Sequence, residues 1–412
     1  MRIWHLTKTL SGGAGQYALR LSNALRAQGM ESSVLVAEGP VSDGAAELRR
    51  VDSPIRRFAA RGFRSLSHRI SLGPFHSVCG PERYESPHTI QAGDIVHLHG
   101  MTGWIGVSGL RNLIPRGAKV FWTAHDVWML TGGCVVYQGC DQFHNDCSKC
   151  PILRAPWKRL AQRELRVKQA FINAYQVRPI ANSQWMASRI RESRLFNQVD
   201  SIPIIPPIVD VAYLAEDIPD LRRELAIAED RKVISLGARS LDDKFKGITE
   251  FLAQLSQTAE LAGQLTVLLF GPGKIEIPAN LDVRLLGNII DPRQLAKVYR
   301  TSDVYVSSSY METFGMTLVE AQACGTPVVA FDVGGVRDAM QPESHRWLEP
   351  TSRLDNLVQR LNQRLQHNGI ERNHQNYLWE WAKHSFGAES LARAQLLAYQ
   401  RVDEVAAEVT KL

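Results

Sequence analysis

Residues 307–331 read SSSYMETFGMTLVEAQACGTPVVAF, and this stretch decides which fold the rest of the chain fits. An apolar strand is followed by a helix that begins after the Phe-Gly pair. Free N–H groups at the start of such a helix attract a phosphate, and Gly315 lets a ligand approach the backbone closely. Glu312 precedes the helix, Glu320 lies inside it, and Thr317 can cap it. The stretch therefore indicates a site for a phosphate-bearing ligand; the alternative is a surface loop whose acids are only solvated.

Short apolar strands alternate with helices on both sides of this stretch. In the first half of the chain we expect strands at 2–6, 32–39, 94–100, 119–126 and 177–183. In the second half we expect them at 232–240, 264–273, 283–288, 303–309 and 326–332. Such alternation predicts mostly parallel sheets with helices on both faces, so the expected fold class is α/β.

Three prolines divide the two halves, because Pro203, Pro206 and Pro207 stiffen the chain and disfavour a helix there. We expect an N-terminal Rossmann-like domain at 1–205 and a C-terminal one at 206–383. The tail at 384–412 has helical apolar spacing, and we expect it to pack back on the N-terminal domain. Two doubly wound sheets would leave a ligand cleft between their carboxyl edges.

The stretch at 307–331 resembles the signature of glycosyltransferase family 4, in which two glutamates stand eight positions apart around a Phe-Gly pair. The order of elements agrees over nearly the whole chain. The resemblance implies the GT-B fold, with two Rossmann-like domains facing each other across a cleft, and a retaining, metal-independent transfer from a nucleotide diphosphate sugar. It also implies that Glu312 binds sugar hydroxyls and Glu320 the ribose. The diphosphate and sugar would be bound by the backbone of Phe314, Gly315, Met316 and Thr317.

Further residues stand where this family places its site. Arg239 and Lys246 follow the first strand of the second half, where two cations can offset the charge of a leaving diphosphate. Lys244 is a nearby substitute for Lys246, and each cation taken alone is more typical of a surface. The resemblance places Gly12 and Gly13 against the diphosphate and acceptor.

Histidines end two of the expected strands. The resemblance places His125 beside the transferred sugar, although a lone histidine at a strand end is more often structural. His97 and His99 end a strand on the expected acceptor side, and for these two we favour a structural role.

Four cysteines lie within a short loop, with the spacing C-x5-C-x6-C-x2-C: Cys134, Cys140, Cys147 and Cys150. Thiolates at such spacing suit a tetrahedral zinc ion, although the spacing is looser than in a zinc ribbon. The alternatives are reduced thiols that pack the loop, or an iron–sulfur cluster, which nothing in the proposed reaction needs. The loop is similar to one in bacterial family 4 enzymes of surface polysaccharide assembly. A zinc ion there would be structural, and no cofactor is expected for catalysis.

The chain carries 48 Lys and Arg against 42 Asp and Glu, a formal charge of +6 that suits an anionic partner. It shows no signal peptide and no apolar run of spanning length, so we expect it in the cytosol or on a membrane surface facing it. Between residues 49 and 69 lie seven arginines, accompanied by apolar residues at helical spacing: Arg49, Arg50, Arg56, Arg57, Arg61, Arg64 and Arg69. This segment suits an anionic bilayer, or else it is a solvated basic loop.

The expected reaction is attack of an acceptor hydroxyl on a nucleotide diphosphate sugar, with a saccharide or lipid-linked saccharide as acceptor. The alternatives are a nucleotide-sugar epimerase of GT-B fold and a nucleic-acid-binding protein built on the cysteine loop. The basic runs lack interleaved aromatic residues, so no nucleic-acid partner is expected. The sequence leaves the base, the sugar and the linkage open.

Overall fold

The computed structural model describes residues 2–51, 53, 58, 69–73, 75, 83–367 and 372–409, and for 372–374 and 401–409 the backbone alone. The chain forms two compact units. Unit 1 comprises Met1–Pro206 and Leu391–Leu412, and unit 2 comprises Pro207–Ser390. The chain therefore passes between the units twice, first within the proline-rich segment and again near the start of the last helix.

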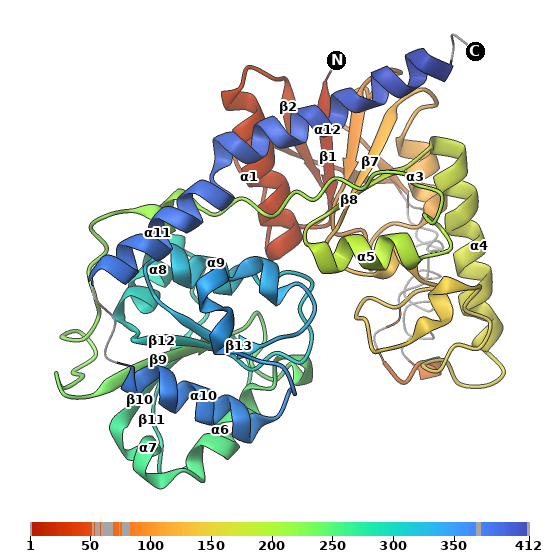
Figure 1. Ribbon diagram of the computed structural model, residues 1–412. Helices are drawn as coiled ribbons and strands as arrows, with labels where there is room; N and C mark the ends of the chain where they lie inside the picture. Colours follow the sequence, from red (N-terminus) through yellow and green to blue (C-terminus); the bar gives the residue numbers. More distant parts are fainter. Residues whose placement is uncertain are drawn as a thin grey trace. The chain divides into compact units, whose positions relative to one another are not determined.

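Unit 1 contains a six-stranded parallel sheet in the order β3-β2-β1-β6-β7-β8 (Figure 1). Its strands are β1 (Ile3–Thr7), β2 (Ser32–Val36), β3 (Ala45–Glu47), β6 (Ile95–Leu98), β7 (Lys119–Ala124) and β8 (Arg178–Ala181). Its helices are α1 (Gly13–Ala27), α3 (Val107–Leu113), α4 (Lys158–Tyr175), α5 (Gln184–Glu192) and α12 (Ala388–Val409). A small antiparallel pair, β4 (Arg49–Arg50) and β5 (Tyr84–Glu85), lies outside the sheet.

Unit 2 repeats this architecture with the strand order β11-β10-β9-β12-β13-β14. Its strands are β9 (Lys232–Gly237), β10 (Leu265–Phe270), β11 (Asp282–Gly287), β12 (Val304–Ser307), β13 (Val328–Phe331) and β14 (Leu348–Glu349). Its helices are α6 (Ile248–Ser256), α7 (Ala259–Gln264), α8 (Pro292–Thr301), α9 (Met316–Ala323), α10 (Leu354–Gln366) and α11 (Arg372–Phe386).

Alternating residues of the unit 2 strands fill two hydrophobic cores, one on each face of the sheet. Val233 belongs to the core under α8, α9 and α11, whereas Ile234 belongs to the core under α6, α7 and α10 (Figure 1). Strands buried on both faces must be apolar throughout, which explains the continuous runs of Val, Ile and Leu in the sequence. The expected α/β fold of two doubly wound parallel sheets is confirmed.

The tail differs from a single continuous helix. Two helices, α11 and α12, meet at Gly387, where a Cβ would lie 2.5 Å from the carbonyl oxygen of Lys383. Residues 384–390 belong to unit 2, because the ring of Phe386 packs against Phe314. From Leu391 onward the chain belongs to unit 1.

Candidate active site

Each sheet has a point where the strand order reverses direction. In unit 1 this point lies between β1 and β6, and in unit 2 between β9 and β12. The loops that leave the two central strands diverge there, so their carboxyl ends form a crevice in which open α/β sheets bind ligands. Most residues expected from sequence follow these strands, whereas His125 follows the neighbouring strand β7.

In unit 2 the central contact is an ion pair between the loops that follow β9 and β12. The Nζ atom of Lys246 donates a hydrogen bond to Oε1 of Glu312. Their side chains are 28% and 15% exposed, so both remain accessible to a ligand. Lys244, the alternative lysine, is exposed, and it is Lys246 that contacts Glu312.

Backbone geometry explains why Lys246 reaches this position. Gly247 has a φ of 61°, and a Cβ there would lie 2.5 Å from the carbonyl oxygen of Ser308. The Ser308 hydroxyl donates to the carbonyl oxygen of Lys246 at 2.8 Å. Glycine thus allows the two loops to touch, and the serine holds them in register.

Two adjacent glycines, Gly334 and Gly335, hold the backbone of Glu312. Gly335 N–H donates to the Glu312 carbonyl oxygen at 3.0 Å, and a Cβ on Gly334, whose φ is 56°, would overlap that oxygen. Sequence reasoning missed these residues. The Gly-Gly pair one residue after the expected strand at 326–332 is the signal that points to them.

The start of α9 offers its backbone to a ligand. Gly315, with a φ of 102°, is the N-cap residue and has no side chain with which to cap the helix. Phe314 is buried and packs on Phe386, so its ring is structural. The expectation that Thr317 caps the helix is wrong, because Thr317 is the second helical residue and its hydroxyl bonds to Tyr305. Met316 is partly buried against the same core.

Glu320 is buried, with 8% of its surface exposed, and Oε2 accepts a hydrogen bond from the Tyr299 hydroxyl at 3.2 Å. Burial, and then the Glu320 charge, raise the pKa of Tyr299, so Tyr299 keeps its proton and acts as the donor. Arg239 is exposed on the loop after β9. Unit 2 thus brings together Lys246, Glu312 and the start of α9, with Glu320 inside that helix.

In unit 1 a histidine within β1 and the histidines directly after β6 and β7 form a chain of hydrogen-bonded rings. His5 Nδ1 lies 3.0 Å from His99 Nε2, and His99 Nδ1 lies 3.1 Å from His125 Nε2. Burial lowers the pKa of His125 to about 3, so its ring is neutral at physiological pH. Tyr17 of α1 packs edge-on against His125, with ring centroids 4.9 Å apart. His125 is therefore held by two elements besides its own.

His5, His97 and His99 also have ring nitrogens within 4.8 Å of one another, the only such group of potential metal ligands among the described residues. Both nitrogens of His97 are engaged, with Tyr399 and Thr123, each at 2.7 Å. Both nitrogens of His99 are engaged as well, as given above. The arrangement is a hydrogen-bonded network rather than a free metal site, which agrees with the structural role expected for His97 and His99.

The glycine turn after β1 begins α1. Gly12 is the N-cap residue, with a φ of 91° that favours glycine. A Cβ on Gly13 would meet nothing within 4 Å among the described residues, so packing does not explain that glycine. The start of α1 lies beside the loop after β6, since a Cβ on Gly100 would lie 3.0 Å from the Cβ of Ala14.

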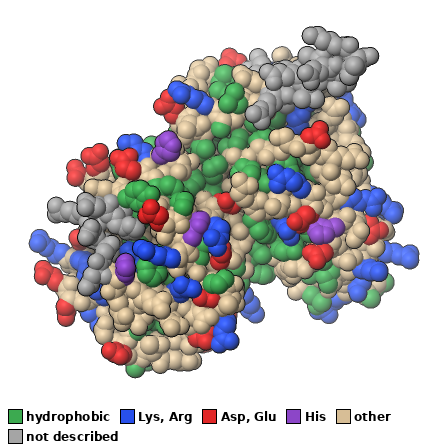
Figure 2. All heavy atoms as spheres, viewed as in Figure 1, with side chains coloured by type: hydrophobic (Ala, Val, Ile, Leu, Met, Phe, Trp, Pro, Cys, Tyr) green, Lys and Arg blue, Asp and Glu red, His purple; other side chains and the backbone are tan. Residues whose placement is uncertain are grey.

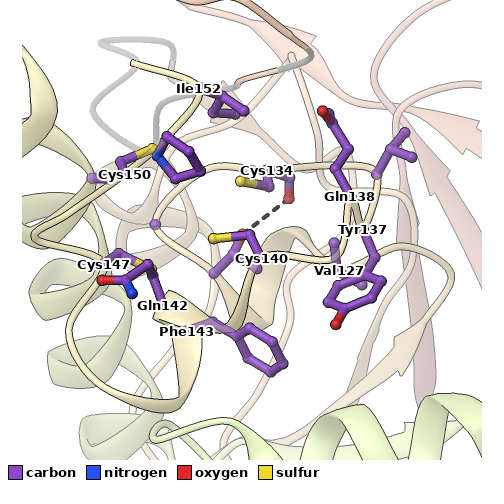
Figure 3. Close-up of a pocket in the computed structure, with 15 residues that line it drawn as sticks. Val127, Cys134, Tyr137, Gln138, Cys140, Gln142, Phe143, Cys147, Cys150 and Ile152 are labelled. Carbon is purple, nitrogen blue, oxygen red and sulfur yellow. Dashed lines mark hydrogen bonds between the residues drawn. The ribbon is translucent and has the colours of Figure 1, made fainter. Parts of the chain in front are cut away.

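The cysteine loop surrounds a separate cavity of about 180 Å³ in unit 1 (Figure 3). All four expected cysteines line it as free thiols: Cys134, Cys140, Cys147 and Cys150. Burial, the largest cause, raises the pKa of Cys134 to about 12 and that of Cys147 to about 11. These two thiols are therefore protonated while the cavity holds no cation.

Most of the arginine-rich segment at 49–69 lies outside the described residues. Where the surface is described, acidic and basic side chains are interspersed over the face shown in Figure 2. No helix in the described part of the chain has the length and apolar composition needed to span a bilayer.

Two family models match the chain, one in each unit. Residues 11–213 match Glycosyltransferase Family 4, and residues 217–381 match Glycosyl transferases group 1. Several relatives are named D-inositol 3-phosphate glycosyltransferase. The one from Actinosynnema mirum is 25% identical over 380 residues, which cover 84% of each chain. The one from Segniliparus rotundus is 31% identical over 172 residues, which cover 39% of this chain but only 38% of that protein.

Solved glycosyltransferase structures share the fold at low sequence identity. Sucrose-phosphate synthase from Thermosynechococcus elongatus superposes with a TM-score of 0.66 at 19% identity, covering 98% of this chain and 100% of that one. Anabaena HepE in complex with UDP-glucose superposes with a TM-score of 0.58 at 16% identity, covering 100% of both chains. With one model matching each unit, the chain belongs to the glycosyltransferases of the GT-B fold, with a family 4 N-terminal unit and a group 1 C-terminal unit.

Proposed function

We propose that this glycosyltransferase moves a sugar from a nucleoside diphosphate sugar to an acceptor hydroxyl, with retention of the anomeric configuration and without a catalytic metal ion. The observation that carries the proposal is the Lys246–Glu312 pair beside the glycine-capped start of α9. This arrangement sets cationic and N–H donors for phosphate next to a carboxylate that accepts from sugar hydroxyls.

The diphosphate would bind at the start of α9. The N–H groups there are not used by a side-chain cap, and the helix dipole favours an anion. Lys246, joined by Arg239 from the same loop region, would offset the charge that develops on the diphosphate as the bond to the sugar breaks. A side chain at position 315 would obstruct this approach, which explains the glycine.

Within unit 2, the sugar would be oriented by Glu312. Glu312 pairs with Lys246, and its carboxylate oxygens can accept hydrogen bonds from two hydroxyls. The neutral His125 ring would contact a sugar hydroxyl without adding a positive charge. Glu320, which one Tyr299 hydrogen bond holds in place, would contact the ribose.

Retention would follow from attack on the face that the diphosphate leaves. The acceptor oxygen bonds to C1 as the C1–phosphate bond breaks, and the acceptor proton passes to an oxygen of the departing phosphate. Asp126, the carboxylate next to His125, accepts from the Trp128 N–H at 2.9 Å and caps a turn. That role argues against Asp126 as a covalent nucleophile.

As acceptor we propose a saccharide carried on a lipid diphosphate at a membrane surface. The arginine-rich segment between residues 49 and 69 supports an anionic, membrane-held acceptor. Because several relatives are named D-inositol 3-phosphate glycosyltransferase, D-inositol 3-phosphate is the second acceptor to assay beside the lipid-linked saccharide. Both acceptors carry phosphate, so they are distinguished by direct assay.

The test has two stages. First, thermal unfolding is followed with UDP-glucose, GDP-mannose and ADP-glucose, since a donor bound only by the folded protein at about 100 times its Kd adds about 2.7 kcal/mol. Second, the stabilising donor is incubated with each acceptor, and proton NMR identifies the anomer formed. An α-linked product from an α-linked donor, undiminished by EDTA, supports the proposal. An inverted anomer, or a donor that is epimerised without any acceptor, contradicts it.

A further inference from the structure

The loop between β7 and α4 surrounds a cavity that the proposed transfer does not use. It contributes Cys134, Cys140, Cys147 and Cys150, which we call the cysteine cluster, and Figure 3 shows their side chains around one space. The sulfur atoms of Cys134, Cys140 and Cys150 are turned toward that space. No disulfide joins any of the described cysteines. Four reduced thiols at one cavity are the donor set of a structural zinc site.

Backbone N–H groups already point at two of the sulfurs. The N–H groups of Ile152 and Leu153 donate to the sulfur of Cys150, and the N–H of Gly132 donates to that of Cys147. A hydrogen bond to sulfur favours the thiolate over the thiol, and such bonds fix the orientation of metal ligands. A packing role alone does not require a backbone turned toward these two sulfurs.

A buried cation lies close to the cluster. Lys168 of α4 is fully buried, and its Nζ donates to the carbonyl oxygens of Trp128 and, at 2.7 Å, Thr131. Its charge acts first on the buried Glu164 of the same helix and then on Cys134 and Cys147. Four thiolates around one Zn²⁺ carry a net charge of about −2, which is costly to bury, and an ammonium nearby offsets part of it. The surroundings therefore include a buried cation close enough to interact with an anionic metal centre.

We propose that the cysteine cluster binds one structural Zn²⁺ ion. In the structure, no three of the four sulfurs lie within 4.8 Å of one another, since the histidine trio is the only group of described residues that meets this limit. Zinc–sulfur bonds of about 2.3 Å require closer sulfurs, so binding draws them inward by rotation of the cysteine side chains. The cavity of about 180 Å³ provides space for that rotation.

The ion would cross-link a loop that has little regular structure of its own. The loop contains only the short turns Trp128–Leu130 and Asp141–His144, and isolated bridges join Cys134 to Phe75 and Leu153 to Ser71. It leaves β7 directly after His125 and Asp126. A bound ion would therefore stabilise the segment that follows a candidate site residue, without taking part in transfer.

The experiment measures the metal content of full-length protein purified without added metal. We expect about one zinc per chain in the wild type and less than about 0.2 after Cys147→Ser or Cys150→Ser, since losing one thiolate greatly weakens a four-thiolate site. Cys324→Ser is the matched control, because Cys324 is also a buried free thiol but lies in unit 2. It should retain the wild-type zinc content.

A second measurement on the wild type covers the case in which the variants fail to fold. Exchange of the bound ion for Co²⁺ should give the strong visible absorption of a tetrahedral cobalt thiolate, and the four thiols should resist alkylation until the metal is removed. Metal-free protein whose thiols alkylate readily would overturn the proposal. So would disulfides found by mass spectrometry, or the absorption of an iron–sulfur cluster.

Discussion

Lys246 and Glu312 come from separate loops and meet because Gly247 and Gly334 allow backbone contacts that a side chain would prevent. The ion pair is partly exposed, so it adds at most about 1 kcal/mol to stability. The two loops are held in this geometry by four residues: Gly247, Ser308, Gly334 and Gly335. Because the ion pair itself adds little stability, these constraints indicate that the pair is positioned for a ligand.

Removing either partner should therefore slow transfer and spare the fold. We expect Lys246→Ala and Glu312→Ala each to lower kcat at least about tenfold, because each loses a contact worth over about 1.4 kcal/mol in the transition state. Lys244→Ala is the matched control and should retain wild-type turnover. Steady-state kinetics with a saturating donor measure the effect, and equal rates for the Lys244 and Lys246 variants would remove Lys246 from the site.

Gly13 provides a test in which packing and ligand approach predict different outcomes. Because a Cβ there meets no described atom within 4 Å, Gly13→Ala should leave the melting temperature unchanged or raise it slightly. If the turn contacts the diphosphate, KM for the donor should rise several-fold. Gly263→Ala has equally open surroundings in α7 and should change neither donor KM nor kcat. A variant at position 13 with the wild-type KM would contradict donor contact.

At the scale of elements, α12 supplies a hydrogen-bond partner to the buried histidines of unit 1. The Tyr399 hydroxyl lies 2.7 Å from His97 Nδ1, and both residues are buried. This contact joins the last helix to β6, which is 302 positions earlier in the chain. It anchors α12 to the same strand ends that position His125.

Tyr399→Phe should destabilise unit 1 by about 1–3 kcal/mol, because it leaves a buried ring nitrogen without its partner. Tyr377→Phe is the comparison, since Tyr377 is 45% exposed and its hydroxyl accepts one hydrogen bond from Gln341 Nε2 at 3.1 Å, so its loss should cost about 1 kcal/mol or less. Urea unfolding measures both. Equal midpoints for the two variants would mean that the buried contact contributes no more than the partly exposed one.

The sequence predicted those elements whose signal is local. Long apolar runs such as residues 265–270 predict buried strands, and these predictions were correct. The short edge strands β3 and β14 were missed, because two or three residues carry no periodicity. The break between α11 and α12 was missed because it depends on a contact from the linker, in which Val209 N–H donates to the Phe386 carbonyl oxygen.

Contacts between strands were beyond sequence reasoning at the site as well. The chain of His5, His99 and His125 exists because β1, β6 and β7 are neighbours in the sheet, and no local pattern specifies that order. The choice between Lys244 and Lys246 likewise depended on the left-handed backbone of Gly247. The residue types were predictable, whereas their partners were not.

At the scale of the whole molecule, buried histidines make stability depend on pH. His5, His97 and His99 are fully buried, and burial lowers the pKa of each below the ordinary value of 6.5, that of His5 to about 3. The unfolded chain binds these protons below pH 6.5 and the folded chain does not. Their contribution is therefore complete above about pH 6.5 and is lost as the pH falls toward 3.

Asp126 acts in the opposite direction, because burial raises its pKa to about 6 and the folded state binds its proton first. Burial also lowers the pKa of His125 to about 3, so four groups act against one and leave a net loss of about 4 kcal/mol per pH unit well below pH 6.5. We expect the urea midpoint to fall between about pH 7.5 and about pH 5.5, with most of the loss in the lower part of that interval. A midpoint that is flat or rises toward pH 5.5 would show that these rings are protonated in the folded protein.

The positive net charge of the whole molecule favours binding to an anionic membrane surface. We expect wild-type protein to bind anionic vesicles at low salt, and replacement of Arg56, Arg57, Arg61 and Arg64 by Gln to weaken binding by up to about a thousandfold, at about 1 kcal/mol per arginine. The matched control replaces four exposed arginines at and around the start of α4, which changes the net charge equally: Arg154, Arg159, Arg163 and Arg166. Vesicle sedimentation decides between a docking segment and a general charge effect. Equal loss in both variants, or binding that ignores lipid charge, would exclude docking by this segment.

The return of the chain to unit 1 after residue 390 also determines the order in which the protein can mature on the ribosome. Unit 2 is an insertion within unit 1, so it is synthesised before the part of α12 that belongs to unit 1. Until Tyr399 leaves the exit tunnel, His97 lacks a partner that the finished protein provides. The N-terminal sheet therefore lacks this contact for as long as unit 2 is being synthesised. A nascent chain arrested before α12 should expose unit 1 to proteolysis and chaperone binding.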